Sequence, residues 1–312
     1  MARVLVTGGA GFVGSHLCAA LRARGDEAVA IDDLSNGKRS NLGADVPLEV
    51  FDLAERGWMS ALGGRRFDSV VHCAAQSSNA LSFRDPMSDL RANQLATLNV
   101  LEFCRVESIR RLVFTSSMSV YGNPPSLPTP PAEIPRPLTY YALHKAASEG
   151  YIQLARDLDW TIFRLYTTYG FGQNLSNLNQ GLVKIFLGFV LRGEPVRVRG
   201  RGDRLRDIIH VSDVVDAVMR SLAAPRSFGQ TYNLACGSPM RVSEIIGCIL
   251  ESAGKPGDYP VAYEAGDVGD PDQTHADISL TRRDLGWCPA VLPPEGIRMT
   301  VRQHVRDLAG TT

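Results

Sequence analysis

Short apolar segments rich in β-branched residues alternate with longer segments of helical periodicity over the first 170 residues. The short segments have the length of buried strands, and the longer ones repeat their apolar residues at helical spacing. The predicted strands are Arg3–Thr7, Glu27–Ile31, Ser69–His72, Arg111–Thr115 and Thr161–Leu165, and the predicted helices are Gly14–Arg24, Leu90–Glu107 and Tyr140–Asp157. This alternation predicts an α/β fold with a doubly wound parallel sheet.

The pattern changes after Gly170. Residues 171–206 contain an all-apolar helical segment and a stretch rich in Arg and Gly, whereas 207–236 contain one more helix and one more strand suited to the sheet. Residues 237–312 combine short helices with Pro and Gly turns. We therefore expect a nucleotide-binding domain of residues 1–170 and 207–236, and a smaller discontinuous α/β lobe of residues 171–206 and 237–312 over its carboxyl edge.

Composition narrows the functional classes. The 312 residues carry no formal net charge, so no basic excess attracts nucleic acid or anionic lipid. The six cysteines are scattered without a C-x-x-C pair, which indicates a reducing compartment without disulfides, and the six histidines form no ligand-spaced pair for a metal. The longest apolar run, LVKIFLGFVL, contains a lysine and is too short for a bilayer. The first strand leaves no room for a signal peptide, so we expect a cytoplasmic protein.

The first predicted strand runs into a glycine-rich turn and then a helix. Gly8, Gly11 and Gly14 follow the spacing G-x-x-G-x-x-G. A tight turn and close approach of the backbone to a pyrophosphate both exclude a Cβ atom, and the free N–H groups at the start of the helix favour the anion. The strand, turn and helix together predict a dinucleotide site.

An acidic residue follows at the spacing that this motif requires. Asp32 ends the second strand, where a carboxylate accepts hydrogen bonds from ribose hydroxyls and repels a 2′-phosphate. This favours NAD over NADP as the cofactor. Lys38 and Arg39 follow Asp32 closely in the sequence, so NADP remains an alternative cofactor.

Tyr141 and Lys145 are spaced i, i+4 and lie on one face of a predicted helix that Thr139 caps. A phenol has a pKa of roughly 10, and a nearby ammonium and an oxidised nicotinamide both lower it. Such a tyrosine can remove a hydroxyl proton while hydride leaves the same carbon. Ser117, at the carboxyl end of the fourth predicted strand, can donate to the same substrate oxygen. Tyr140 is the competing tyrosine but lacks the spacing to Lys145.

These segments resemble the extended short-chain dehydrogenase/reductase family, which contains the NAD-dependent nucleotide-sugar epimerases and dehydratases. The resemblance runs through TGGAGFVGSHL, DDLSNG, VVHCAA, TSSMSVYG, YALHK, RDIIHVSDVV, YNLACG and ADISLTRRDLGW. It implies a Rossmann domain that binds NAD, a C-terminal lobe that binds a nucleoside-diphosphate sugar, and a homodimer formed through the Leu90–Glu107 and Tyr140–Asp157 helices.

The resemblance also assigns roles to residues. The implied catalytic residues are Ser117, Tyr141 and Lys145. The implied cofactor residues are Gly8, Gly11, Phe12, Val13, Gly14, Asp32, Asp33, Leu34, Ser35, Asn36, Gly37, Asp52, Leu53, Ala74, Ala75, Gln76, Asn93, Tyr141 and Lys145. The implied substrate residues are Ser78, Ser117, Thr167, Asn177, Asn179, Gln180, Arg199, Arg206 and Asp270. No metal is expected.

The residues after Ser117 bear on the reaction. The similar 4,6-dehydratases carry a Thr-Asp-Glu run there, whereas this chain has Met118 and Ser119, neither of which replaces a carboxyl in acid–base work. This favours epimerisation at C4 through a transient 4-keto sugar. A dehydratase, a reductase or an epimerase acting at another carbon remains the alternative, and a non-catalytic dinucleotide sensor is a more distant one.

Three departures from the family pattern leave the identity of the substrate open. Thr167 replaces a usual Asn, and Arg199 stands near the base pocket where an aromatic or apolar residue is common. The arginine that usually precedes a Gly-Asp pair and clamps the diphosphate is replaced by an acidic residue at both corresponding positions, Glu264 and Asp267. The clamp then depends on Arg206, with or without a second arginine.

Overall fold

A computed structural model describes residues 1–175, 177–178, 180–266 and 269–310. Its centre is a seven-stranded sheet in the order β11-β6-β5-β4-β1-β2-β3, and every neighbouring pair in it is parallel. The strands are β1 Arg3–Thr7, β2 Glu27–Asp32, β3 Leu48–Val50, β4 Ser69–His72, β5 Arg111–Ser117, β6 Asp159–Leu165 and β11 Gln230–Leu234. Strand order runs outward in both directions from β1, which confirms the doubly wound α/β fold.

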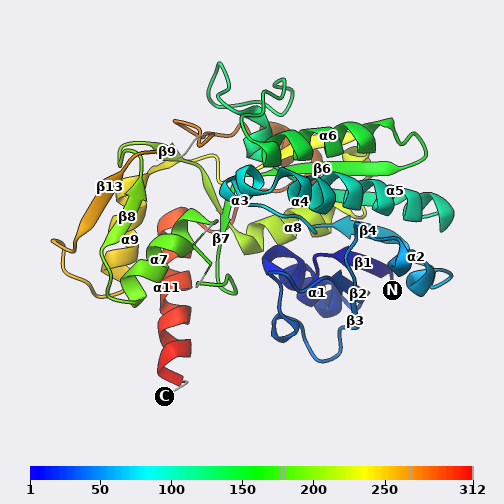
Figure 1. The fold of residues 1–312 in the computed structure, drawn as a ribbon, viewed down its shortest axis with the longest axis horizontal. Coiled ribbons are helices and arrows are strands. Elements are labelled where there is room, and N and C mark those ends of the chain that lie inside the picture. The colour runs from blue at the N-terminus through cyan, green and yellow to red at the C-terminus, as the bar shows by residue number, and fades with distance from the viewer. Residues whose placement is uncertain (176, 179, 267–268, 311–312) are drawn as a thin grey trace.

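Helices cover both faces of this sheet (Figure 1). Along β1 the side chains alternate: Val4 and Val6 join one apolar cluster, and Leu5 joins the other. The first cluster packs against α1 Phe12–Arg24 and α8 Val211–Ser221, and the second against α2 Gly57–Leu62, α5 Ala96–Val106 and α6 Tyr140–Leu154. Burial on both faces explains why these strands are nearly all apolar.

The predicted helix Leu90–Glu107 is three consecutive elements. They are α4 Pro86–Leu90, a π-helical turn η2 Arg91–Leu95, and α5. The Asn93 side chain lies in the π-turn and donates to the carbonyl of Asp89 at 3.2 Å. π-turns of this kind frequently mark functional sites. The helix predicted to reach Asp157 ends earlier, at Leu154, because Ala155 leaves the helical conformation with ψ 84°.

Many of the remaining elements form a lobe beside the carboxyl edge of the sheet (Figure 1). Three small sheets pair β7 Thr167–Tyr169 with β10 Ile208–His210, β8 Val196–Arg199 with β13 Val261–Glu264, and β9 Leu205–Arg206 with β12 Met240–Arg241. A third apolar cluster joins α7 Leu182–Leu191, α9 Val242–Ser252 and α11 Pro293–Gly310. The short elements left are α3 Asn79–Arg84, α10 Ser279–Leu285, η1 Arg39–Asn41, η3 Met118–Tyr121 and η4 Pro225–Ser227.

Candidate active site

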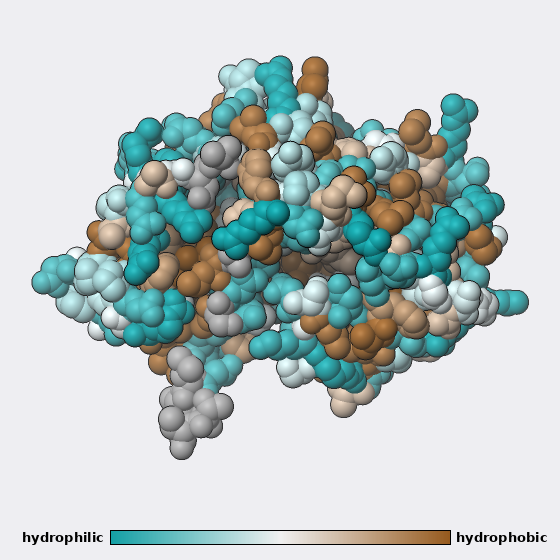
Figure 2. Space-filling view, viewed as in Figure 1, coloured by the Kyte–Doolittle hydropathy of each residue, from teal (hydrophilic) through white to brown (hydrophobic). Residues whose placement is uncertain are grey.

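A cavity of about 1410 Å³ lies between the carboxyl edge of the sheet and the lobe. The surface is hollowed at this boundary (Figure 2). We call one side of the cavity the cofactor wall; it consists of the lining residues from 8–14, 32–41, 51–53 and 73–77. We call the other side the lobe wall; it consists of the lining residues from 171–206 together with Glu264 and Asp270. Ligands bind at this edge in doubly wound folds because the loops there diverge to either side of the sheet.

The glycine turn leaves room for a phosphate. Gly8 has φ 64°, and the Gly11 N–H donates to its carbonyl at 3.0 Å. A Cβ atom at Gly14 would overlap that same carbonyl, so a side chain there would break the turn. Gly11 is the N-cap of α1 and offers no side-chain cap, which leaves the first N–H groups of the helix available to an anion. The turn therefore fits the pyrophosphate of a dinucleotide.

Asp32 is buried at the end of β2 and lines the cavity. Its carboxylate accepts the N–H of Ala10 at 3.0 Å and that of Leu34 at 2.9 Å, which fixes its orientation. Burial raises the pKa of Asp32 despite these hydrogen bonds. The Arg39 guanidinium is turned to backbone carbonyls, with Val46 O at 2.9 Å, whereas Lys38 lines the cavity. The carboxylate is thus placed to accept ribose hydroxyls.

Most of the predicted cofactor residues line the cavity. The exceptions are Leu34, which packs against the core, and Asn93, which is buried behind the wall. The Asn93 amide donates to Gln76 O at 3.0 Å and so supports the loop from behind. Those that do line it are Gly8, Gly11, Phe12, Val13, Gly14, Asp32, Asp33, Ser35, Asn36, Gly37, Asp52, Leu53, Ala74, Ala75, Gln76, Tyr141 and Lys145.

The predicted catalytic residues also meet at this cavity. Thr139 caps α6, its hydroxyl accepting the Ala142 N–H at 3.1 Å, and this places Tyr141 and Lys145 inside. Ser117 ends β5 and lines the same space. Tyr140 is 43% exposed and lies outside the cavity lining, whereas Tyr141 is 8% exposed. The geometry therefore favours Tyr141 over its neighbour.

The electrostatics of these two residues differ from the sequence-based expectation. Burial raises the pKa of Tyr141 to about 12, although a hydrogen bond with Ser117 acts in the opposite direction. Burial also lowers the pKa of Lys145 to about 7, and its Nζ lies 3.9 Å from the centre of the Phe114 ring. The protein alone therefore does not produce a ready phenolate. A positive charge close to Tyr141, such as that of an oxidised nicotinamide, would lower its pKa.

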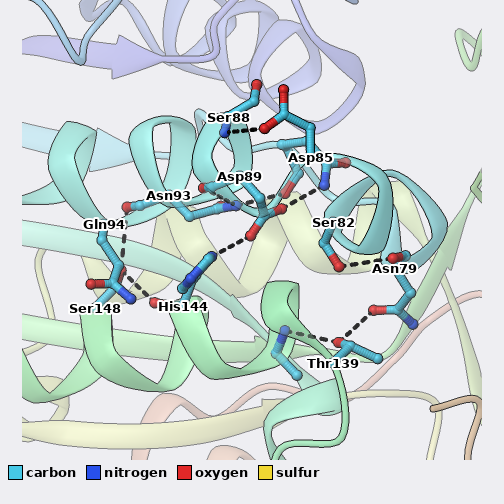
Figure 3. Close-up of polar contacts among 12 residues, drawn as sticks. Asn79, Ser82, Asp85, Ser88, Asp89, Asn93, Gln94, Thr139, His144 and Ser148 are labelled. Atoms are coloured by element: carbon cyan, nitrogen blue, oxygen red, sulfur yellow. Dashed lines mark hydrogen bonds and ion pairs between the residues drawn. The ribbon is translucent and has the colours of Figure 1, made fainter.

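A buried polar network connects α4 and η2 with α6 (Figure 3). His144 Nδ1 and Asp89 Oδ2 are 2.5 Å apart, and the other Asp89 oxygen accepts from the Gln76 amide at 2.5 Å. Ser148 donates to the carbonyls of Asn93 and His144 at 3.2 and 2.9 Å. The negative charge of Asp89 raises the pKa of both Tyr141 and Lys145. The network links the loop after β4 to α6.

Some of the residues predicted to contact the sugar lie together at the cavity. Thr167 lines the cavity from β7. The Ser77 hydroxyl donates to Gln180 at 2.6 Å, and the Asn177 amide donates to Asn36 at 3.1 Å, so the two walls meet across the cavity.

Two predicted residues from this side are not in the cavity lining. Ser78 is buried, and its side chain accepts the Leu81 N–H at 3.3 Å at the start of α3. Asn179 lies outside the described residues.

The three predicted charged residues all line the cavity. Arg206 is 2% exposed, and its guanidinium lies 3.0 Å from Asp270. Asp270 also pairs with Arg204 at 2.5 Å, so one carboxylate holds two buried guanidinium groups in the lobe wall. Arg199 ends β8 beside them. Asp267, the second acidic position noted in the sequence, lies outside the described residues.

Several lining residues were not identified from the sequence. Arg204 and Arg197 belong to an Arg-rich stretch whose fold could not be assigned, and Thr115 is the first residue of the TSSMSVYG motif, two positions before Ser117. Lys184 could have been identified from the sequence, because it is a charged residue within the apolar run Leu182–Leu191.

No group of side chains suited to a metal ion occurs within the described residues. In the same part of the chain, no helix has the length and apolar character needed to cross a membrane.

The fold is of the Rossmann type, and the glycine turn and Asp32 in its cavity fit a dinucleotide. The sequence model described as "NAD dependent epimerase/dehydratase family" matches residues 4–235. The UDP-glucose 4-epimerase of Mycolicibacterium smegmatis is 35% identical over 308 residues, which cover 96% of this chain and 97% of that protein.

Solved structures agree. A UDP-glucose 4-epimerase from Thermotoga maritima, crystallised with UDP-glucose, superposes with a TM-score of 0.93 at 31% identity, covering 98% of this chain and 99% of its own. The Thermus thermophilus UDP-glucose 4-epimerase in complex with NAD has a TM-score of 0.89 at 36% identity, covering 97% and 99%. The chain therefore belongs to the NAD-dependent epimerase/dehydratase family. NAD as the cofactor and nucleotide-sugar epimerisation as the activity, both predicted from the sequence, are confirmed.

Proposed function

We propose that the protein interconverts the C4 epimers of a UDP-sugar, with Tyr141 as the base. The observation that carries this proposal is that Tyr141, Lys145 and Ser117 line one cavity with the glycine turn. The similar proteins from Mycolicibacterium smegmatis and Thermotoga maritima are both UDP-glucose 4-epimerases, which supports the choice of uridine and of C4.

The residues act on the sugar as follows. Bound NAD supplies the chemistry of accepting a hydride from C4 and returning it. Tyr141 takes the proton of the 4-hydroxyl and later gives it back, while Ser117 donates to the same oxygen. The Lys145 ammonium stabilises the phenolate. Dehydration needs a carboxyl group beside Ser117, and the residues that line the cavity there are Met118 and Ser119, whose Oγ is 2.7 Å from that of Ser117.

The two walls divide the ligand between them in this proposal. The domain of residues 1–170 and 207–236 binds NAD, and the lobe of residues 171–206 and 237–312 binds the nucleotide sugar. Asp52 and Leu53 lie by the adenine, and Asn177 and Gln180 by the sugar. Arg199 lies by the base, and Arg206 with Asp270 by the diphosphate. The pairing of Asn177 and Gln180 with the opposite wall supports their position over the ligand.

We also propose a homodimer. Apolar side chains are exposed on neighbouring helices of one side: Met87 on α4 and Leu98 on α5 are 66% and 42% exposed, and Leu143 and Leu154 on α6 are 50% and 78% exposed. A second copy packed on α5 and α6 buries this surface as a four-helix bundle. Changing Leu98 and Leu143 together to Glu should halve the mass measured by light scattering, and an unchanged mass rejects this interface.

A cytoplasmic location suits the six free thiols.

The decisive experiment is a product screen by NMR. Purified protein is incubated, without added cofactor, with UDP-glucose and UDP-galactose, and in parallel with UDP-hexosamines, UDP-uronic acids and the ADP-, GDP-, CDP- and dTDP-sugars. One pair of C4 epimers at equilibrium establishes the reaction and the sugar. Accumulation of a keto or deoxy sugar rejects epimerisation in favour of dehydration, and turnover only with stoichiometric reduced cofactor indicates a reductase.

A further inference from the structure

His144 is a buried histidine on α6 that no step of the proposed reaction uses. It stands directly before Lys145, so its side chain leaves the helix about 100° around the axis from that of Lys145. Lys145 lines the cavity, whereas His144 lies outside the lining and points to Asp89 on α4 (Figure 3). The helix therefore presents one face to the cavity and holds a second face against its neighbour.

Asp89 is almost completely buried, and both of its carboxylate oxygens have partners. Oδ2 lies 2.5 Å from His144 Nδ1, and Oδ1 accepts from the Gln76 amide at 2.5 Å. An ionised carboxylate can only accept, so the Nδ1 proton of His144 and an amide proton of Gln76 both point to it. A buried carboxylate is costly unless such donors satisfy it, so the loss of either donor leaves a poorly compensated charge.

The contact of Asp89 with Gln76 reaches the cavity. Gln76 belongs to the loop after β4 and lines the cavity. Its amide nitrogen also donates to Ser78 O at 2.9 Å, and its amide oxygen accepts the Ser78 N–H at 2.5 Å. Both ends of the amide are therefore occupied, and a displacement of Asp89 also displaces this loop.

A second contact ties α6 to α3. The Thr139 hydroxyl donates to the Asn79 side chain at 2.9 Å (Figure 3). Thr139 precedes Tyr141 and His144 follows it, so the helix is held on both sides of the phenol. Thr139 also caps α6, and its loss would change the helix itself. His144 is the contact that can be removed without removing the cap.

We propose that His144 and Asp89 form a clamp that fixes the distance between α6 and the loop after β4, which makes His144 a positioning residue for the reaction. The inference rests on the proposed function. β4 lies next to β5, the strand that carries Ser117, so the clamped loop begins beside the catalytic residues. Tyr141 has to meet the sugar hydroxyl while the sugar lies against the cofactor, and a misplacement of about 1 Å can cost about a hundredfold in rate.

The test removes the imidazole and keeps Asp89. His144→Leu takes away the donor, whereas His144→Asn restores an N–H two bonds from Cβ, where histidine has Nδ1. We expect His144→Leu to lower kcat by about tenfold to a hundredfold, with KM for the nucleotide sugar and the NAD content changed less than about threefold. The binding terms stay because neither His144 nor Asp89 lines the cavity. His144→Asn should recover most of kcat.

The control for stability is Tyr232→Phe. It likewise removes a donor to a carboxylate, Asp284 at 3.1 Å, from a residue that is not in the cavity lining. Both His144→Leu and Tyr232→Phe should lower Tm, but only the first should lower kcat. A histidine with a merely structural role would behave as Tyr232 does, with a lower Tm and wild-type kcat, and that result overturns the proposal.

A second readout needs no substrate. In protein labelled with 15N-histidine, the Nδ1–H of His144 should give a proton signal downfield of the backbone amides, because it is buried and donates to a carboxylate. The signal should be absent from His144→Leu. Its absence from the wild-type protein, or a loss of kcat that His144→Asn does not recover, also overturns the clamp. A wild-type protein that shows the signal but converts no UDP-sugar refutes the proposed function alone, and the variants are then compared on the nucleotide sugar that it does convert.

Discussion

The two walls of the cavity present different chemistry to one continuous space. The cofactor wall is built from backbone N–H groups and acceptor carboxylates such as Asp32, held by short turns at strand ends. The lobe wall presents long cationic side chains, including Arg206 and Lys184. Binding at the cofactor wall depends on the position of the backbone, whereas binding at the lobe wall depends on how its charges are paired. Mutations in the two walls should therefore impair different functions.

The largest expected effect is on the chemistry between the walls. Tyr141→Phe removes the phenol and keeps the ring, so turnover should fall about a thousandfold, the scale of lost acid–base catalysis. Bound NAD should stay at the wild-type level, because neither wall is changed. Turnover is measured by NMR and the cofactor by its absorbance after denaturation. Tyr140→Phe, on the exposed neighbour, is the control. Full turnover of the Tyr141 variant would remove the tyrosine from the mechanism.

The next effect concerns the backbone of the cofactor wall. Gly14→Ala places a Cβ atom against the carbonyl of Gly8, so the purified protein should contain little or no NAD. Gly247→Ala is the matched control: it lies on the exposed side of α9 with nothing within 4 Å of the new methyl group. This second change should raise the free energy of unfolding by about 0.5–1 kcal/mol, because alanine favours the helix. Wild-type NAD content in Gly14→Ala would show that the turn tolerates a side chain.

A smaller effect is expected when a charge is removed from the lobe wall. Arg206→Met should raise KM for the nucleotide sugar by about tenfold to a hundredfold and leave the NAD content unchanged. Asp270 keeps Arg204 as a partner, which limits the loss of stability. The control is Arg201→Met, an exposed arginine nearby that pairs with Asp203 and is not in the cavity lining. A loss of NAD together with the rise in KM would contradict the separation of the two walls.

The smallest effect is a shift of the pH profile. A negative charge favours the protonated forms of its neighbours, and Asp89 accordingly raises the pKa of Tyr141 and of Lys145. Asp89→Asn removes that charge, so both pKa values should fall. The acidic limb of kcat/KM, which reports deprotonation of Tyr141, should therefore move to lower pH. A profile recorded from pH 5 to pH 10 checks this.

The control for the pH profile is Asp85→Ser. Asp85 is exposed at the start of α4, where its side chain accepts the Ser88 N–H, and serine can keep that cap. Water and salt screen the lost charge, so the profile should not move. A shift of the Asp89 variant toward higher pH would show that the network positions the tyrosine without setting its charge.

The sheet and the cofactor wall were predictable from the sequence because both depend on local rules. A buried parallel strand needs a continuous apolar run, and a glycine turn needs the absence of Cβ atoms; Arg3–Thr7 followed by Gly8, Gly11 and Gly14 satisfies both within a few residues. The spacing of Tyr141 and Lys145 likewise fixed their common helix face.

The tertiary structure decided what depends on distant segments. The pairing of Arg204 and Arg206 with Asp270 joins residues more than 60 positions apart, and the contact of His144 with Asp89 joins two separate helices. The burial of Ser78 as a helix cap depends on how its loop enters α3.

The sheet, the glycine turn and the common helix face of Tyr141 and Lys145 could therefore be derived from the sequence, because local spacing specifies backbone shape and helix faces. Only the tertiary structure decided how charge is distributed around them, because burial and pairing depend on segments far apart in the chain. Both pKa directions at Tyr141 and Lys145 follow from burial, and so does the lowered pKa of Lys184.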